Sequence, residues 1–382
     1  FFDPIAPASP FFLPKGAQVM NSLIDYVKEL YMKYGYQEVM TPQIFNTDLW
    51  KQSGHLDAYS ENMYFVDVDE REFGVKPMNC PAAAMLYLAD SHSYRELPMR
   101  LADFGRLHRN ERSGVTHGLT RVRSFVQDDA HIFCTLDQIG DEINSFLKML
   151  REAYDTLGFD SYRLELSLRP EKRVGTDEMW DTAETTLTKL LDASGVEYTA
   201  EAGEGAFYGP KIDIFVPDAI GRDWQLGTVQ LDFSLPERFD MEYAAEDGTR
   251  QRPVVIHRAM YGSLERFLGV LIEHLSGAFP LWMAPVQAVV VPIADRHIDF
   301  CNEIGAKLKA AGIRVNVDDS NDRMNSKIRQ AQLQKVPYML VAGDQEIEAG
   351  TVAVRTRTGE NLNPMGVDEV VDKFLKQIEE RS

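Results

Sequence analysis

The sequence lacks the features that would place the protein in a membrane or outside the cell. No apolar run approaches the 18 or so residues that a membrane-spanning helix needs. Residues 1–16 have neither the basic start nor the continuous apolar stretch of a signal peptide. Only three cysteines occur in 382 residues, and an odd number argues against a disulfide framework. We therefore expect a protein of the cytoplasm with no membrane partner.

Positive charge is also scarce, because the formal net charge is −19 at pH 7. Taken alone, this value disfavours a nucleic-acid partner. The deficit is uneven, however, since residues 286–382 carry 13 Lys and Arg against 15 Asp and Glu, and the rest of the chain carries 27 against 44. The C-terminal quarter is therefore nearly neutral and holds local basic clusters. The total charge weakens an RNA-binding interpretation without excluding it.

The glycine loops that commonly bind nucleotides are missing as well. The sequence contains neither the Gly-x-x-x-x-Gly-Lys phosphate loop nor the Gly-x-Gly-x-x-Gly dinucleotide turn. If the protein uses a nucleotide, it must hold the phosphates with side chains.

The pattern of apolar residues predicts two domains. Residues 1–284 combine long antiparallel strands with flanking helices, which is typical of an α+β fold. Expected elements there include an amphipathic helix at 17–34 and a hairpin of strands at 99–108 and 121–127. In residues 285–382, short strands of the buried type alternate with helices, which predicts a small α/β domain with a mostly parallel sheet.

The hairpin concentrates side chains that suit a nucleotide. Arg109 and Glu111 end one strand, and Arg121 and Arg123 begin the next. Since alternate residues share a strand face, these groups would lie beside Phe125 and Gln127. Guanidinium groups, an aromatic plane and a carboxylate fit phosphates, a purine ring and its amine. A ladder of cross-strand ion pairs on a solvated face explains the same pattern.

A second set of residues could bind a metal. Cys80, His131 and His257 offer the thiolate and imidazole ligands that zinc prefers, and three protein ligands leave one position for substrate. No local spacing supports this set, and Cys134 could replace one member. A buried cysteine with two hydrogen-bonded histidines is the alternative. Cys301 falls within an amphipathic helix and is expected in the core.

Several stretches resemble the class II aminoacyl-tRNA synthetases and, within them, the threonyl-tRNA synthetase family. FGRLHRNERSGVTHGLTRVRSFVQDDAHIFC looks like motif 2, HRAMYGSLERF looks like motif 3, and the helix before YQEVMTP looks like motif 1. KPMNCP, RPEKRVGTDEMW, GEGAFYGPKID and GTVQLDFSLP are also similar to that family, and VPYMLVAGDQEIEAGTVAVRTR is similar to its anticodon-binding domain. The resemblance covers nearly the whole chain. It implies a catalytic domain at 1–284 and an anticodon-binding domain at 285–382, without the N-terminal editing region of many members.

The resemblance implies activation of L-threonine by ATP with Mg²⁺, followed by transfer to tRNA(Thr). Arg109 would hold the α-phosphate and the substrate carboxylate, and Lys211 would neutralise charge near the same phosphate. Arg266 would hold the γ-phosphate. His55 matches a family histidine near the terminal adenosine, where it would help to deprotonate the ribose hydroxyl. The other expected ATP contacts are Glu111, Arg121, Phe125 and Gln225.

The resemblance also implies one zinc ion per chain on Cys80, His131 and His257. Valine has the shape of threonine but offers no hydroxyl to a metal, so its rejection can be strong. Serine lacks only one methyl group, a difference of about 1–3 kcal/mol, so the pocket alone should admit some serine. The residues that match positions lining this pocket are Met78, Gln127, Asp129 and Tyr208.

One motif departs from the family. Where members usually have Cys-Pro-Gly-His, this chain has Cys80, Pro81, Ala82 and Ala83. The missing histidine is not a zinc ligand in the family, so zinc binding is still expected, although Ala82 adds a β-carbon at the start of a helix.

Further implied contacts concern RNA and a second subunit. The positions that match family contacts to anticodon bases are Asn321, Arg329, Glu346 and Arg355, and unstacked bases in RNA loops are read by such hydrogen-bonding groups. The motif 1 helix normally forms a two-fold interface in this class, so a homodimer is expected. The alternatives are a synthetase-like RNA-binding or regulatory protein without catalysis, or an enzyme of the same class for serine or proline.

Overall fold

The computed structural model describes residues 1–218 and 220–381. They form two compact units. The first unit comprises residues 1–11 and 24–271, and the second comprises residues 12–23 and 272–382. The domain boundary expected at 284/285 stays a prediction.

A nine-stranded sheet dominates the described part of the first unit. Its order is β1-β6-β8-β15-β12-β11-β9-β10, with β7 also paired to β8, and every pairing except β1–β6 and β9–β10 is antiparallel. The strands run over Gln37–Glu38 (β1), Met99–Asp103 (β6), Arg106–His108 (β7), Ser124–Cys134 (β8), Arg163–Ser167 (β9), Tyr198–Glu201 (β10), Lys211–Pro217 (β11), Asp223–Asp232 (β12) and Val254–Ser263 (β15).

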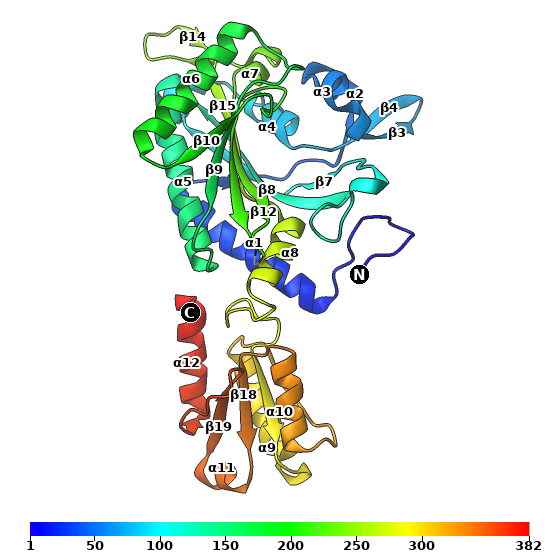
Figure 1. The fold of residues 1–382 in the computed structure, drawn as a ribbon, viewed down its shortest axis with the longest axis vertical. Helices are drawn as coiled ribbons and strands as arrows, with labels where there is room; N and C mark the ends of the chain where they lie inside the picture. Colours follow the sequence, from blue (N-terminus) through cyan, green and yellow to red (C-terminus); the bar gives the residue numbers. More distant parts are fainter. Residues whose placement is uncertain (219, 382) are drawn as a thin grey trace. The chain divides into compact units, whose positions relative to one another are not determined.

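Two smaller sheets and several helices complete this unit. Helices α1 and α5 lie side by side (Figure 1), and the Tyr26 hydroxyl donates to Thr156 Oγ1 at 2.8 Å. The small sheets have the orders β2-β4-β3 and β14-β13-β5. Their strands are Ile44–Asn46 (β2), Tyr64–Val68 (β3), Arg71–Val75 (β4), His92–Ser93 (β5), Tyr243–Ala244 (β13) and Arg250–Gln251 (β14). The helices are Pro14–Tyr34 (α1), Thr47–Gln52 (α2), His55–Tyr59 (α3), Cys80–Tyr87 (α4), Ile139–Thr156 (α5), Asp177–Ser194 (α6), Ser234–Arg238 (α7) and Leu264–His274 (α8).

The two faces of the central strands carry different side chains, because successive residues of a strand point to opposite faces. Arg258 is fully buried against α1, where its guanidinium lies 4.7 Å from the Tyr31 ring centroid and donates to the Tyr31 hydroxyl at 3.2 Å. Asp128 lies on the same face and accepts from the backbone of Met260 and Tyr261 at 2.8 and 3.0 Å. Asp129 and His257, which are the chain neighbours of Asp128 and Arg258, therefore point to the opposite face of the sheet.

The second unit contains a five-stranded sheet of order β17-β16-β18-β19-β20. Strands β17, β16 and β18 are parallel, but β19 and β20 join antiparallel, so two of the four pairings are parallel where a mostly parallel sheet was predicted. Cys301 lies in its core, as expected. The elements are Ala288–Pro292 (β16), Ile298–Ala310 (α9), Val315–Val317 (β17), Met324–Leu333 (α10), Tyr338–Ala342 (β18), Asp344–Ala349 (α11), Thr351–Thr356 (β19), Met365–Gly366 (β20) and Val367–Glu380 (α12).

Most predicted elements are present. The main difference is in the hairpin, where the first strand is interrupted between β6 and β7 and the second extends to Cys134 as β8. Arg109, Glu111, Arg121 and Arg123 therefore lie in the connecting loop rather than on the strands. Within the described residues, no helix has the length and apolar character needed to cross a membrane.

Candidate active site

Strand register brings together residues that are far apart in the sequence. His131 of β8 is paired with His257 of β15, and His257 is paired with Gln230 of β12. In the adjacent row, Asp129 and Thr228 flank Ala259. Since residues two apart on a strand share a face, both rows present their side chains to the same side of the sheet.

The N-terminus of α4 adds the thiol of Cys80 to this row. One ligand atom each from Cys80, His131 and His257 lies within 4.8 Å of the other two, and all three residues are buried. His131 Nε2 and His257 Nδ1 are buried without a hydrogen-bond partner among the described residues. Buried polar atoms normally have partners, so two unpaired imidazole nitrogens beside a thiol fit a metal ion of the zinc type.

The electrostatics of the two histidines differ. Burial, together with the neighbouring His257, lowers the pKa of His131 well below its usual value. Burial also lowers the pKa of His257, but Cys80 and the bond to Asp232 outweigh it and raise that pKa to about 10. Cys134 is three residues after His131 in β8 and so points to the opposite face. Among the described residues it is not part of the cluster, which removes it as a competing ligand.

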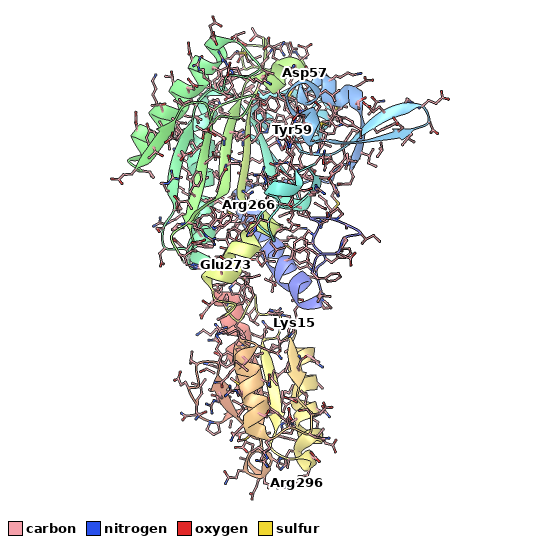
Figure 2. All side chains as sticks on the ribbon, turned by 45° about the vertical axis from the view of Figure 1, so that its right-hand side comes forward. Lys15, Asp57, Tyr59, Arg266, Glu273 and Arg296 are labelled. Carbon is pink, nitrogen blue, oxygen red and sulfur yellow. The ribbon has the colours of Figure 1, made fainter. Side chains whose placement is uncertain are left out.

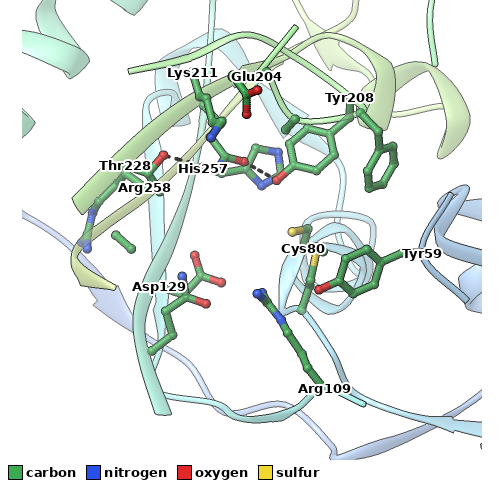
Figure 3. A pocket seen from close by; sticks show the side chains of 17 residues that line it. Tyr59, Cys80, Arg109, Asp129, Glu204, Tyr208, Lys211, Thr228, His257 and Arg258 are labelled. Atoms are coloured by element: carbon green, nitrogen blue, oxygen red, sulfur yellow. Dashed lines mark hydrogen bonds between the residues drawn. The ribbon is translucent and has the colours of Figure 1, made fainter. Parts of the chain in front are cut away.

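A cavity of about 290 Å³ opens in front of the cluster. Figure 3 shows Arg109 and Asp129 on one side of it and Lys211 and Tyr208 on the other. The Tyr208 hydroxyl donates to Gln230 Oε1, and its ring lies 4.9 Å from that of His257. All four residues predicted to bind the amino acid line this cavity: Met78, Gln127, Asp129 and Tyr208.

Asp129 is the buried carboxylate of the cavity. Burial raises its pKa to about 6, although a hydrogen bond from Asn79 Nδ2 to Asp129 Oδ2, at 3.0 Å, acts in the opposite direction. At neutral pH the group is therefore mostly ionised and can accept from a cationic amine.

A second pocket of about 220 Å³ adjoins the first, and the two share Arg109, Gln127, Thr228 and Gln230 as lining residues. Arg109 thus stands at the wall between them. Its guanidinium lies 5.1 Å from the centroid of the Phe125 ring. All six residues predicted to bind ATP line this second pocket: Arg109, Glu111, Arg121, Phe125, Gln225 and Arg266.

The arginines of the second pocket come from different segments. Arg266 belongs to α8 (Figure 2), and its guanidinium donates to the backbone oxygens of Thr120 and Gln225 at 2.7 and 3.2 Å. Burial lowers the pKa of Arg266, and the charges of Arg121 and Arg109 lower it further. Cations that repel one another in a partly buried pocket are typical of an anion site.

Several of these groups are paired with acidic side chains. Arg121 forms an ion pair with Glu111 at 2.9 Å, and Lys211 Nζ donates to Asp213 Oδ2 at 2.6 Å. Asp213 also accepts from Gln225 Nε2 at 2.6 Å. Arg123, which the strand pattern grouped with these residues, instead donates to the backbone oxygen of Glu111 and is absent from the pocket lining.

His55 lies behind the first cavity. It is almost fully buried, and its ring nitrogens contact Ser53 Oγ at 2.8 Å and Met78 Sδ at 3.3 Å. Burial lowers its pKa to about 3, with the positive charges of His257 and Arg109 contributing, so the ring is neutral at pH 7. It lines a small cavity with Cys80 and Tyr208.

Sequence reasoning missed three supporting residues, namely Asn79, Asp213 and Asp232. Each acts through a hydrogen bond to another site residue, and no local sequence motif predicts such a bond. Their only signal was their place inside stretches already noted for other residues.

The predicted anticodon contacts occupy four segments of the second unit. Asn321 and Glu346 follow the carboxyl ends of β17 and β18, whereas Arg329 lies on α10 and Arg355 in β19. Asn321 and Arg329 are exposed. Glu346 accepts from the Gly343 amide at 2.9 Å, and Arg355 Nε is buried without a partner among the described residues.

Comparison with known proteins agrees with this geometry. Residues 64–275 match the tRNA synthetase class II core domain (G, H, P, S and T), and residues 287–377 match an anticodon-binding domain. The chain is 45% identical to a crystal structure described as the RNA binding domain of threonyl-tRNA synthetase from Cryptosporidium parvum Iowa II, with a TM-score of 0.95 over 98% of this chain and 95% of that one. The chain belongs to the threonyl-tRNA synthetase family.

Two further comparisons show how much of its relatives this chain covers and how widely the fold is shared. The threonine–tRNA ligase of Bdellovibrio bacteriovorus is 51% identical over all of this chain, which spans 58% of that protein. A prolyl-tRNA synthetase from Giardia lamblia, in complex with prolyl-adenylate, has a TM-score of 0.73 over 99% of this chain and 77% of that one at 19% identity, which shows a shared fold alone.

Proposed function

We propose that this chain activates L-threonine with ATP and transfers the threonyl group to tRNA(Thr). The observation that carries the proposal is the pair of adjoining pockets with Arg109 between them. One pocket offers a carboxylate and a metal-type cluster, and the other offers a group of arginines. An amino acid and a nucleotide bound there would meet at Arg109.

The first step in this proposal is in-line attack by the threonine carboxylate on the α-phosphorus of ATP. A new P–O bond forms and the bond to pyrophosphate breaks, so the products are threonyl-adenylate and pyrophosphate. The step depends on positioning and cations rather than on proton transfer. Arg109 and Lys211 would stabilise charge at the α-phosphate, and Arg266 would hold the γ-phosphate. Mg²⁺ would enter with ATP.

We assign zinc to Cys80, His131 and His257. When bound there, it would supply a Lewis-acidic position for the amine and hydroxyl of threonine. Asp129 would accept from the amine, and Tyr208, Gln127 and Met78 would enclose the side chain. The remaining ATP contacts would come from Glu111, Arg121, Phe125 and Gln225.

For the transfer step we propose His55 as the group that helps to take a proton from the ribose hydroxyl. The match to the family histidine supports this role, whereas the pKa of about 3 makes the buried ring a weak base as it stands. Because Nε2 contacts the Met78 sulfur at 3.3 Å and the ring is buried, His55 would have to become accessible when the tRNA terminus binds.

In the second unit we propose that Asn321, Arg329, Glu346 and Arg355 read anticodon bases. Replacing Arg355 with alanine should lower the rate of tRNA charging about fivefold or more, because one specific base contact contributes about 1–3 kcal/mol. Threonine-dependent pyrophosphate exchange should be unchanged. An equal loss in both assays would refute the assignment.

We further propose a homodimer with α1 at its two-fold interface, in the cytoplasm. The apolar residues Val19, Leu23 and Val27 of α1 are already buried within the chain, so the contact would use other residues. Met32 and Met40, which are 76% and 86% exposed, are candidates. Light scattering that shows only a 43.3 kDa species would contradict this proposal. All three cysteines are unpaired, which fits a reducing compartment.

The decisive experiment is exchange of labelled pyrophosphate into ATP with threonine, serine or valine present. We expect exchange with threonine, weaker exchange with serine, none with valine, and loss of activity after treatment with a chelator. A folded, zinc-loaded protein that gives no exchange with any amino acid would favour a non-catalytic RNA-binding protein instead. Ala82 and Ala83 would then be the first residues to restore to the family's Gly-His.

A further inference from the structure

Asp232 links the cluster of Cys80, His131 and His257 to the rest of the fold. It is the last residue of β12 and is 1% exposed. Its Oδ2 lies 2.9 Å from His257 Nε2, and its Oδ1 accepts from the backbone amides of Ser234 and Leu235 at 2.7 and 2.9 Å. One carboxylate therefore holds both a histidine ring and the start of α7.

This contact decides which nitrogen of His257 can bind a metal. An ionised carboxylate only accepts hydrogen bonds, so His257 Nε2 must carry the hydrogen. Metal binding releases the second ring proton of His257, which leaves a free lone pair on Nδ1. Nδ1 is also the nitrogen that is buried without a partner among the described side chains. Metal-binding histidines generally donate their other N–H to a carboxylate, backbone carbonyl or water, which fixes the tautomer and the ring orientation.

We propose that Asp232 is a positioning residue that holds His257 as the Nε2–H tautomer, with Nδ1 directed at the metal. The inference rests on the proposed zinc site. The two bonds to α7 fix the carboxylate itself, so the orientation of the ring is set by the fold rather than by the metal. Asp232 neither binds the ion nor contacts a substrate in this proposal.

Asp232→Asn tests the tautomer. If the asparagine oxygen keeps the two bonds to α7, its NH₂ group faces His257 Nε2 and donates to it, which moves the ring hydrogen to Nδ1. If the amide turns over, the bonds to α7 are lost instead. Asp232→Ser provides a second variant, because a serine oxygen can keep the helix cap but is too short to reach the ring.

The measurement is the zinc dissociation constant of the full chain, by competition with a chromophoric chelator, together with thermal unfolding of the metal-free protein. We expect both variants to bind zinc about 10–100-fold more weakly, the usual cost of losing such a partner. Metal-free Asp232→Ser should unfold near the temperature of the parent protein. A cobalt-substituted sample should show an altered ligand-field spectrum in both variants.

Asp218→Asn is the matched control. Asp218 is another buried carboxylate that accepts from backbone amides, those of Ile220 and Arg222 at 3.0 and 2.9 Å, but it lies in the turn between β11 and β12 and has no contact with the cluster. The Asp218→Asn substitution should lower the stability of the protein without changing its affinity for zinc. Unchanged zinc binding in both Asp232 variants would reduce Asp232 to a helix cap, whereas a parent protein that binds no zinc would overturn the zinc assignment and this inference together.

Discussion

The two adjoining pockets differ in what holds their side chains. The cavity proposed for the amino acid takes His257, Gln230 and Asp129 from paired strands, where the register fixes each residue. The pocket proposed for the nucleotide takes Arg109 and Arg121 from the loop between β7 and β8, where ion pairs and backbone contacts hold them. Groups on strands can be fixed before a ligand arrives, whereas groups on loops exchange one partner for another.

This difference suits the separate tasks that the proposed function gives to the two pockets. Selection among threonine, valine and serine needs a rigid site, because a pocket that yields by a fraction of an ångström cannot exclude a near-isostere. Binding of a triphosphate needs cations that can leave their present partners. The pair of Arg121 and Glu111 is a contact that phosphate or adenine would have to replace.

Loss of a metal ligand should have the largest effect and should act on the first cavity alone. Cys80→Ser should reduce zinc content to a small fraction and threonine-dependent exchange by more than about 100-fold, the upper end for loss of an outer partner. ATP binding should persist, since Cys80 is absent from the lining of the second pocket. Metal analysis and calorimetric titration with ATP would check this, and equal loss of ATP affinity would contradict the division.

Arg109 stands at the shared wall and should affect both pockets. Arg109→Gln removes a preorganised charge at the α-phosphate, so kcat/KM for exchange should fall by about 100-fold or more. Zinc content should stay at the parent level. Steady-state exchange at varied ATP and at varied threonine would give the two KM values. If only the KM for ATP rises, Arg109 acts in the nucleotide pocket and not in the amino-acid cavity.

The pH dependence should differ between the two substrates. The pKa of Asp129 is raised to about 6, so the carboxylate is present above that pH and is lost as the pH falls through it. Below pH 6 the KM for threonine should rise, by about tenfold at pH 5, because a protonated carboxyl group loses the charge with which it accepts from the N–H groups of the amine. The KM for ATP should change much less. A threonine KM that is constant from pH 5 to 8 would exclude Asp129 as the acceptor.

The smallest effect is expected at the ion pair of the nucleotide pocket. Glu111→Gln keeps an oxygen acceptor but removes the charge that holds Arg121, so the KM for ATP should change by less than about tenfold. The threonine KM should not change. Fluorescence titration with ATP would measure the affinity directly, and a shift in threonine affinity as large as that in ATP affinity would show that the pockets are coupled.

The sequence predicted the site better than the paths of its strands. The pocket residues sit in local motifs, and all ten expected to bind ATP or the amino acid line one of the two cavities. The predicted strand ends at residue 127, whereas β8 continues through Asp128 and Asp129, residues that are unfavourable in an isolated strand, to Cys134. In the fold, Asp128 accepts from the amides of Met260 and Tyr261, and Asp129 from Asn79. These partners are distant in sequence and carry no local signal.

The second unit shows the same limit in its topology. Four of its five strands and its long helices were predicted, but not β20 or α11, which are too short to give a periodic pattern. Because the connection from β18 to β19 is short, β19 runs antiparallel to β18. Whether a buried strand runs parallel or antiparallel depends on its connection rather than on its own residues.

The opposite faces of β8 and β15 have a consequence for how a preparation of this protein can fail. A slip of β15 by one residue against β8 would exchange the two faces of β15, so that His257 would be lost from the cavity while Arg258 left α1. Chains with such an error would lose metal, activity and the buried polar contacts together. Zinc content per chain would then serve as a direct count of correctly folded molecules, and specific activity should rise in proportion to it from one batch to the next.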